Sequence, residues 1–257
     1  MRITTWNVNG LRASFKKGFY ESVESLNTDV LCLQEIKTRP DQLDVEYVQR
    51  IHQAYPHVSW NPAQRPGYSG TATFSRFAPE RIEHGLGVER FDTEGRVVAS
   101  VYPDFWLFNI YVPNGQNDLG RVPFKLDFYA RLLEICDDLH SQGKQVILCG
   151  DFNTAHKEID LRHPRANAGS TGFLPEERAW IDTYLAHGFE DIFRKRYPDK
   201  VEYTWWTYLS NARQNNTGWR LDYFLVSPSL SERVTDVVNS TAIMGSDHCP
   251  VTLILED

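Results

Sequence analysis

Strand-length apolar runs recur along the whole chain, and they are rich in Val, Ile, Leu and aromatic residues. Runs of this length and composition, bounded by turn-forming residues, are typical of buried β-strands. The pattern predicts strands over residues 2–8, 29–34, 70–75, 96–102, 105–112, 145–150, 220–226 and 248–255. So many strands indicate large sheets.

Between these runs, apolar residues recur at spacings of three and four, which is the pattern of helices that bury one face. This periodicity predicts helices over residues 14–26, 41–54, 121–142 and 175–187. Pro175 suits the first turn of the last helix, and Glu176 and Glu177 place negative charge near its positive dipole end. Gly143 suits the end of the third helix.

Two stretches, residues 60–76 and 96–112, have the pattern of β-hairpins. Hairpins interspersed with helices favour a layered α/β protein with mixed sheets over an all-parallel fold. No GxGxxG sequence follows the first strand, which removes the main sequence support for a nicotinamide or flavin enzyme.

The chain of 257 residues has no Pro/Gly/Ser-rich linker, so we expect one domain over 1–257. The N-terminus lacks the apolar segment of a signal peptide, and no apolar run is long enough to span a bilayer. We therefore expect a cytoplasmic protein without a membrane partner. Four cysteines without CxxC spacing predict neither a disulfide nor a zinc site.

A net charge of −7 and a pI near 5.6 argue against a protein that binds nucleic acid through a broad basic surface. One basic face can still hold phosphates while acidic residues lie elsewhere. Local basic clusters are Arg12, Lys16 and Lys17, then Lys37 and Arg39, then Arg213 and Arg220. A solvated surface is the commoner explanation for each cluster alone.

Polar side chains repeatedly follow or interrupt the strand-like runs near their ends. These residues are Asn7, Asn9, Gln34, Glu35, Tyr111, Asn114, Asp151, Asn153, Asp222, Asp247 and His248. If the strand ends meet at one edge of the sheets, these side chains form a cup of oxygen ligands with one imidazole. Mg²⁺ and Mn²⁺ prefer such ligands, whereas zinc favours more His and Cys. An Asn or Asp after a strand is usually a turn former, so the prediction rests on the conjunction.

Eight blocks along the chain resemble a known family. The matching blocks are TWNVNGLRA at the start, LCLQEIK at 31–37, IYVPNG at 110–115, CGDFNTAHKEIDL at 149–161, TGFLPEERAW at 171–180, YTWWTY at 203–208, GWRLDYFLVS at 218–227 and MGSDHCPVTL at 244–253. Together they resemble the exonuclease III and apurinic/apyrimidinic (AP) endonuclease family over essentially the entire chain. The wider superfamily includes deoxyribonuclease I and inositol polyphosphate 5-phosphatases, but segments 149–161 and 218–227 look like the DNA-repair branch.

The resemblance implies a four-layer α/β sandwich of two mixed β-sheets flanked by helices, as in deoxyribonuclease I. It implies a Mg²⁺-dependent hydrolase, with Mn²⁺ as a substitute, that cuts DNA on the 5′ side of abasic sites. Some 3′-to-5′ exonuclease and 3′-end-cleaning activity is also expected. The partner would be double-stranded DNA with abasic sites or blocked 3′ ends, bound by a monomer that associates with the nucleoid while acting.

The resemblance also implies roles for individual residues. Asp151 would orient or deprotonate the attacking water, with Asn153 beside it and Asn7 supporting it. His248, oriented by Asp222, would contact the scissile phosphate. Tyr111 would donate a hydrogen bond to a phosphate oxygen. The metal ligands would be Glu35, Asn9, Asp247, Asp151 and Asn153.

One departure from the family, a set of DNA-binding residues and a pocket for the sugar complete these expectations. Some family members have Asp where this chain has Asn9, which leaves the site one charge poorer. Residues implied in DNA binding are Arg12, Lys37, Tyr68, Asn114, Trp205, Leu209, Arg213, Trp219 and Leu221. Trp205, Trp219 and Leu221 would enclose the extruded sugar, although strand alternation puts Trp219 and Leu221 opposite Asp222 unless a bend intervenes.

Two other functions compete with this prediction. One is a phosphatase acting on inositol phosphates or lipids, which would use the same Asp and His residues. The other is a catalytically inactive module that binds damaged DNA, although pure binding does not need so much negative charge beside phosphates. The sequence also leaves open whether Asp151 or an ionised Tyr111 takes the proton of the water.

Overall fold

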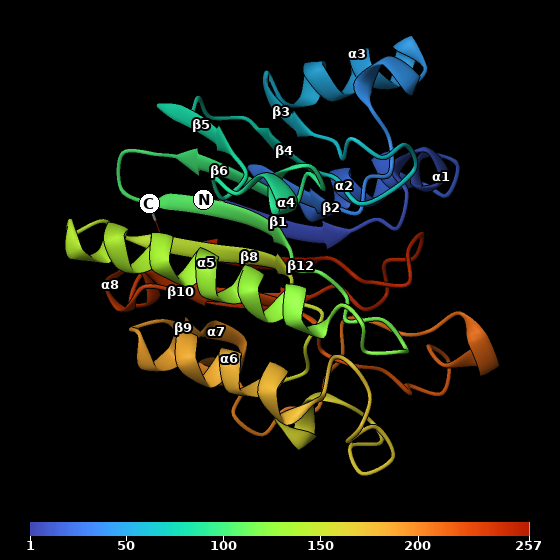
Figure 1. Ribbon diagram of the computed structural model, residues 1–257. Helices are drawn as coiled ribbons and strands as arrows, with labels where there is room; N and C mark the ends of the chain where they lie inside the picture. Colours follow the sequence, from blue (N-terminus) through green and yellow to red (C-terminus); the bar gives the residue numbers. More distant parts are fainter. Residues whose placement is uncertain (257) are drawn as a thin grey trace.

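Two mixed six-stranded sheets form the centre of the computed structural model, which describes residues 1–256 (Figure 1). The order in sheet A is β11 (Val234–Asn239), β12 (Val251–Leu255), β1 (Arg2–Asn7), β2 (Val30–Gln34), β4 (Thr71–Ser75) and β3 (His57–Asn61). The order in sheet B is β5 (Arg81–His84), β6 (Val97–Val101), β7 (Trp106–Tyr111), β8 (Val146–Asp151), β10 (Asp222–Val226) and β9 (Glu190–Asp191). Only the pairs β1–β2 and β7–β8 are parallel among these strands.

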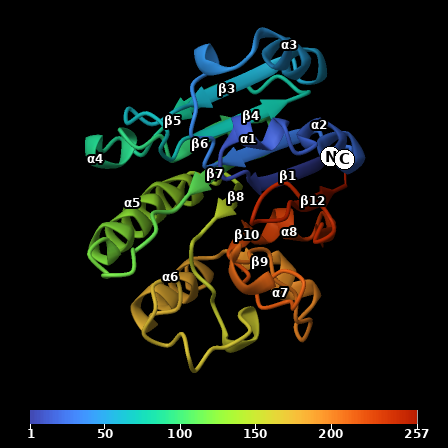
Figure 2. The ribbon, with the colours of Figure 1, turned by 90° about the vertical axis from the view of Figure 1, so that its right-hand side faces the viewer.

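Helices cover the outer face of each sheet, as the two views in Figures 1 and 2 show. Sheet A packs against α1 (Leu11–Phe15), α2 (Phe19–Leu26) and α3 (Val45–Ala54). Sheet B packs against α5 (Val122–Ser141) and α6 (Pro175–Ala186). The shorter elements are α4 (Glu89–Asp92), α7 (Ile192–Arg196), α8 (Pro228–Ser231) and 3₁₀ turns at Pro40–Gln42, Glu158–Asp160 and Leu209–Asn211. The predicted four-layer sandwich is therefore confirmed.

Strand alternation divides the core into three apolar layers. In β1, Ile3 faces the layer between the two sheets, whereas Trp6 faces the helices of sheet A. In β8, Ile147 and Cys149 face the layer between the sheets, whereas Leu148 faces α5 and α6. Because both faces of these strands are buried, the runs read as continuously apolar in the sequence.

The same alternation aims the polar residues at the strand ends into the layer between the sheets. Asn7 continues the row of Ile3, and Asp151 continues the row of Ile147 and Cys149. Asp222 begins the row that Phe224 continues in β10. At this edge, each row has a carboxylate or amide side chain in place of an apolar one.

A buried polar contact joins the two sheets just behind that edge. Gln34 Nε2 donates to Asn109 Oδ1 at 2.7 Å and to Thr5 Oγ1 at 2.8 Å. Asn109 Nδ2 in turn donates to the carbonyl of Ala72 at 2.9 Å. These side chains are fully buried, so their hydrogen bonds fix how the two sheets lie relative to each other.

All eight predicted strands and both hairpins are present, with ends that differ by up to three residues. The predicted helix over 14–26 is instead two helices, because Gly18 has a left-handed φ of 83° between α1 and α2. Strands β5, β9 and β11 were not predicted. The four residues of β5 are exposed and mostly polar, so no apolar run marks this edge strand.

None of the helices within residues 1–256 is both long and apolar enough to cross a membrane.

Candidate active site

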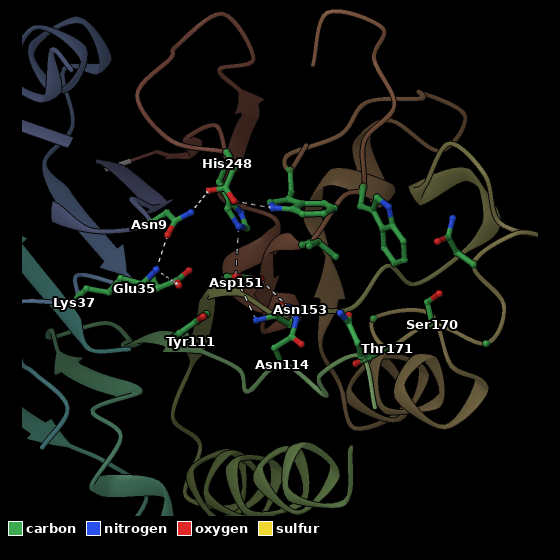
Figure 3. A pocket seen from close by; sticks show the side chains of 18 residues that line it. Asn9, Glu35, Lys37, Tyr111, Asn114, Asp151, Asn153, Ser170, Thr171 and His248 are labelled. Carbon is green, nitrogen blue, oxygen red and sulfur yellow. Dashed lines mark hydrogen bonds and ion pairs between the residues drawn. The ribbon is translucent and has the colours of Figure 1, made fainter. Parts of the chain in front are cut away.

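A cavity of about 830 Å³ opens at the sheet edge where the polar rows end (Figure 3). Twelve of the predicted site residues line it, namely Asn9, Glu35, Lys37, Tyr111, Asn114, Asp151, Asn153, Trp205, Trp219, Leu221, Asp247 and His248. Asn7 and Asp222 lie directly behind them, fully or almost fully buried. The structure therefore brings the ends of distant chain segments into one site.

Strand register explains how Asp151 comes to the centre of this site. It lies opposite Tyr111 in the parallel pair of β7 and β8, and opposite Asp222 in the antiparallel pair of β8 and β10. Asp222 is the first residue of β10 and His248 precedes β12, so neither follows its strand. Because β10 runs antiparallel to β8, its first residue reaches the same edge as the last residue of β8.

His248 is held between two carboxylates. Its Nδ1 lies 2.8 Å from Asp222 Oδ2, and its Nε2 lies 3.7 Å from Asp151 Oδ2. Burial alone would lower the pKa of His248, but Asp222 and Asp151 outweigh that effect and raise this pKa to about 10. At neutral pH the ring is therefore an imidazolium ion whose Nε2 faces the cavity.

Asp151 is itself almost completely buried, and two neighbours fix its orientation. Its Oδ2 accepts a hydrogen bond from Asn7 Nδ2 at 2.9 Å, and its Oδ1 accepts one from the backbone N–H of Asn153 at 2.8 Å. Burial raises the pKa of Asp151 to about 7, although His248 opposes the shift. A carboxyl group that titrates near neutral pH can both accept and release a proton at that pH.

A second group of polar atoms lies on the side of sheet A. Glu35 Oε2 accepts from the same Asn7 Nδ2 that Asp151 uses, at 3.1 Å. Lys37 Nζ lies 2.8 Å from Glu35 Oε1 and donates to Asn9 Oδ1 at 2.6 Å. Asn9 Nδ2 donates to Asp247 Oδ1 at 3.0 Å. Figure 3 shows this series of contacts running from Lys37 toward His248.

These oxygen atoms fit a hard cation. Glu35 and Asn9 already place oxygen atoms around one positive group, the Lys37 ammonium, and the cavity holds four carboxylates in and behind its wall, Glu35, Asp151, Asp222 and Asp247. Lys37 and His248 supply too little positive charge to balance them, so a phosphate anion would be repelled without a further cation. Asp151, Asp222 and His248 also present ligand atoms within 4.8 Å of one another. Two of these three are paired with each other, so the group around Glu35 is the better cation site.

The backbone is unusual at four of the predicted site residues. Asn9, Glu35, Lys37 and Asn153 all have left-handed φ angles, between 44° and 54°. Non-glycine residues rarely adopt this conformation, which costs on the order of 1 kcal/mol or more for each residue. The chain retains it at four positions around one cavity, which indicates that side-chain placement there outweighs local backbone stability.

Tyr111 points into the cavity from the end of β7. Burial, with a further contribution from Glu35, raises the pKa of this tyrosine well above its ordinary value. The guanidinium carbon of Arg96 lies 4.6 Å from the centre of its ring, and Arg96 also donates to its carbonyl at 3.0 Å. Tyr111 is therefore a neutral hydrogen-bond donor at neutral pH, which favours Asp151 over an ionised Tyr111 as the base.

The predicted aromatic wall is present, and its geometry resolves the difficulty raised by strand alternation. Strand β10 begins only at Asp222, so Trp219 lies in the irregular segment before it. Trp219 forms bridges with Trp205 and Leu161, and the rings of Trp205 and Trp219 meet edge to face at 6.3 Å. Both indoles and Leu221 line the cavity beside His248. The bend that the prediction required is therefore the irregular segment that leads into β10, which contains Trp219 and Leu221.

Four predicted DNA-binding residues lie outside the cavity wall. Arg12 is exposed on α1, and Leu209 is 73% exposed. Tyr68 accepts a hydrogen bond from Arg96, and Arg213 donates to the carbonyls of Thr241, Ile243 and Ser246. Because Arg213 is committed to this loop, it shapes the rim as well as supplying positive charge.

Arg220 is not part of a basic surface, contrary to its inclusion in a basic cluster above. It is 1% exposed and pairs with Asp160 at 2.8 Å and with Asp191 at 2.7 Å. Its charge is therefore neutralised inside the protein and is not available to phosphate.

The sequence did not identify one wall of the cavity. It is formed by Asn117 and by the loop residues Asn167, Gly169, Ser170, Thr171 and Gly172. These small polar residues lie in a loop without an apolar pattern, so only the block TGFLPEERAW, of which Thr171 and Gly172 are the first two residues, pointed to this region.

Comparison with known proteins is consistent with this geometry. Residues 4–248 match the Endonuclease/Exonuclease/phosphatase family. An exodeoxyribonuclease of Bacillus subtilis (strain 168) is 44% identical over 257 residues, covering 99% of each chain. The DNA repair nuclease APEX1 of Danio rerio is 42% identical over 261 residues, covering 99% of this chain and 82% of that protein. The solved AP endonuclease LMAP from Leishmania major has a TM-score of 0.89 at 32% identity, covering 100% of this chain and 87% of its own.

Proposed function

The chain belongs to the endonuclease/exonuclease/phosphatase family and is a DNA-repair phosphodiesterase, and on this basis we propose that it cuts duplex DNA on the 5′ side of abasic sites with Mg²⁺ as its cofactor. The observation that carries the proposal is the cavity itself. A protonatable Asp151 and a cationic His248 lie at one end, and the wall of Trp205, Trp219 and Leu221 lies beside them. We infer that Mn²⁺ can replace Mg²⁺ and that the protein acts as a monomer.

The side chains divide the chemistry among them. Glu35, Asn9 and Asp247 would hold the cation, which offsets the charge that develops on the phosphate oxygens. Asp151 takes the proton of the attacking water, because burial keeps its pKa near neutrality. His248 donates through Nε2 to a phosphate oxygen while Asp222 stabilises its positive charge.

Tyr111 and the amides complete the phosphate site. The neutral phenol of Tyr111 donates a hydrogen bond to a second phosphate oxygen. Asn114 Nδ2 donates to Asn153 Oδ1 at 3.1 Å, and Asn153 Nδ2 donates to the carbonyl of Val112 at 2.8 Å. These bonds hold Asn153, whose backbone N–H orients Asp151. The groups are thus in place before substrate arrives, so little reorganisation is needed during the reaction.

The wall beside the phosphate site explains the preference for a missing base. An abasic nucleotide has lost its stacking and pairing, so it leaves the helix at less than the few kcal/mol that an intact nucleotide requires. Two indoles packed edge to face with Leu221 beside them can enclose a deoxyribose and leave no room for a base. Discrimination then arises from exclusion as well as from contact. Blocked 3′ ends present a similarly small group, which accounts for the proposed 3′-end cleaning.

A nicking assay tests the proposal. Duplexes carrying either a tetrahydrofuran abasic analogue or a normal nucleotide at one position are incubated with EDTA, with Mg²⁺ or with Mn²⁺. We expect a single cut on the 5′ side of the analogue, only with a divalent ion. Release of phosphate from soluble inositol polyphosphates in place of this cut would establish a phosphatase, and tight binding without any cut would establish a binding module.

Two variants locate the cation and the pocket. Glu35→Gln should require much more Mg²⁺ for the same rate, since it removes a carboxylate ligand, and a metal titration measures this directly.

Trp219→Ala should reduce the preference for the analogue over the normal nucleotide. If Trp219→Ala only lowers the melting temperature and leaves the ratio of the two rates unchanged, Trp219 is a core residue and not a pocket wall.

A further inference from the structure

Outside the cavity, one charged pair is completely buried between the helices that cover sheet B. Lys125 lies in the first turn of α5 and Glu177 in the first turn of α6, and both side chains have 0% exposure. Lys125 Nζ lies 2.7 Å from Glu177 Oε1. A buried ion pair is often no more stabilising than apolar residues of the same size, so stability alone is a weak reason for it.

Lys125 reaches past its partner to the catalytic segment. Its Nζ also donates to the carbonyl of Asn153 at 2.6 Å. Asn153 has a left-handed φ of 49°, and its backbone N–H donates to Asp151 Oδ1 at 2.8 Å. Lys125 therefore holds the far side of the residue that orients the carboxylate of Asp151.

Glu177 reaches the opposite wall of the cavity. Its Oε1 accepts a hydrogen bond from Thr171 Oγ1 at 2.8 Å, and its Oε2 accepts from the backbone N–H of Gly172 at 2.5 Å. Gly172 packs so tightly that a Cβ there would lie 3.1 Å from the carbonyl oxygen of Asn153 and 3.3 Å from the ring of Trp219. The pair thus joins two segments of the cavity wall that also contact each other.

Helix capping explains only part of this arrangement. Glu177 Oε2 accepts from the backbone N–H of Leu174 at 3.1 Å, which is an ordinary contact at the start of α6. Capping does not require the bonds to Thr171 and Gly172, nor a buried lysine. Neither Lys125 nor Glu177 lines the cavity, so any effect on the reaction must act through the residues they hold.

We propose that Lys125 and Glu177 are positioning residues that hold the Asp151–Asn153 segment against the Thr171–Gly172 wall, and so set the selectivity for a nucleotide without a base. This inference rests on the proposed function. The contact between these segments, held by two charged groups through four hydrogen-bonding contacts, resists the separation that a flipped base would require. Loosening it should admit intact nucleotides and misplace Asp151.

The test compares three variants with the wild type. Lys125→Met/Glu177→Gln is the main variant, because it removes the pair without leaving one buried charge unpaired. Lys125→Met is the second. Tyr184→Phe is the matched control, because Tyr184 Oη joins the same two helices through the carbonyl of Tyr129 at 2.8 Å but contacts no cavity residue. Thermal unfolding curves give the folded fraction of each protein at the assay temperature.

Two ratios are measured on the folded protein, each between the tetrahydrofuran duplex and the intact duplex. One is the ratio of single-turnover rates with Mg²⁺, and the other is the ratio of affinities in EDTA. We expect both to fall on the order of tenfold or more in the double variant, because small changes in the fit of a pocket change its discrimination by amounts of this size. Lys125→Met should change both ratios in the same direction, and Tyr184→Phe should leave both unchanged.

The outcomes separate the two proposals. A wild-type protein that does not prefer the analogue overturns the proposed function. A wild type that prefers it, with a double variant that is merely less stable and retains both ratios, overturns the positioning role alone. Loss of selectivity in Tyr184→Phe to the same extent would also overturn it, because general loosening of α5 and α6 would then suffice.

Discussion

Two clusters of buried charge lie two residues apart on the chain, one around Asp222 in the site and one around Arg220 beneath it. In the first, His248 lies between the carboxylates of Asp222 and Asp151, at 2.8 and 3.7 Å. In the second, Arg220 lies between the carboxylates of Asp160 and Asp191, at 2.8 and 2.7 Å. Each has a cation between two carboxylates, and in the second Arg194 also pairs with Asp160. The pKa values of Asp151 and Asp160 are nevertheless shifted in opposite directions.

The pKa values show the difference. Burial alone would raise the pKa of Asp160, but the charge and hydrogen bonds of Arg220 outweigh it and hold that pKa well below its ordinary value. Burial raises the pKa of Asp151 to about 7, because the opposing effect of the His248 charge is smaller than the effect of burial. Arg220 and Arg194 both donate hydrogen bonds to Asp160, whereas His248 Nε2 lies 3.7 Å from Asp151 and its other nitrogen is paired with Asp222. Carboxylates raised in this way are typical of reactive sites.

The largest expected effect is the loss of turnover in Asp151→Asn. The amide cannot take a proton from water, so the single-turnover rate on the abasic analogue should fall by about 10²- to 10⁴-fold. Affinity measured in EDTA should change little, because the amide of the variant keeps one acceptor oxygen for the backbone N–H of Asn153. Loss of affinity with an unchanged rate would make Asp151 a binding residue.

Arg220→Met should lower the stability of the protein, whereas Asp151→Asn should lower the reaction rate. It leaves Asp191 buried without its cation and Asp160 with Arg194 alone, which should destabilise the protein by about 3–5 kcal/mol in urea unfolding. The rate per folded molecule should remain near that of the wild type. A large loss of rate in the folded protein would mean that Arg220 also shapes the site through Leu221.

The pH dependence of stability in EDTA should separate the two carboxylates by sign. The raised pKa of Asp151 contributes stability below its ordinary value of 3.8 that is lost as the pH rises through about 7. The lowered pKa of Asp160 contributes stability above 3.8 that is lost as the pH falls below it. Between pH 5 and pH 8, Asp151→Asn should therefore lose less free energy of unfolding than the wild type. Equal losses would show that Asp151 is not perturbed.

The smallest expected effect concerns exposed arginines, whose charge is not balanced within the protein. Affinity for duplex DNA should fall with salt, and Arg12→Ala should reduce the slope of log K against log salt by about 1. Arg233→Ala is the control, since Arg233 pairs with Asp104 near the start of β7, at the edge opposite the cavity. Equal slopes in wild type and Arg12→Ala would exclude a phosphate contact at Arg12.

The fold was largely predictable because its central strands are buried on both faces. Apolar runs such as 145–150 are then continuous and easily recognised, whereas β5 is exposed and has no such run. A single left-handed glycine, Gly18, divides one predicted helix into two. Local conformation of this kind is decided by one residue and is not visible in the periodicity.

The site was predictable only in part, for a related reason. Residues at the ends of apolar runs, such as Asp151 and Glu35, stand out against their surroundings. Lys125 and Glu177 are 52 positions apart within helices, where a lysine and a glutamate normally face solvent. Nothing local marks them as a buried pair. Arg220 was assigned to a basic cluster for the same reason, because charge in the sequence does not reveal its partners.

The polar contact between the sheets, made by Gln34 and Asn109, has a consequence for engineering this protein. Asn7 comes from sheet A and Asp151 from sheet B, so the length of their hydrogen bond depends on the thickness of the apolar layer between the sheets. Substitutions that enlarge or shrink Cys149 in that layer would change the reaction rate from a distance, without touching substrate. Attempts to raise thermal stability are therefore safer in the outer layer over sheet A, where helices can shift without altering the spacing of the sheets or the contacts of Lys125 and Glu177.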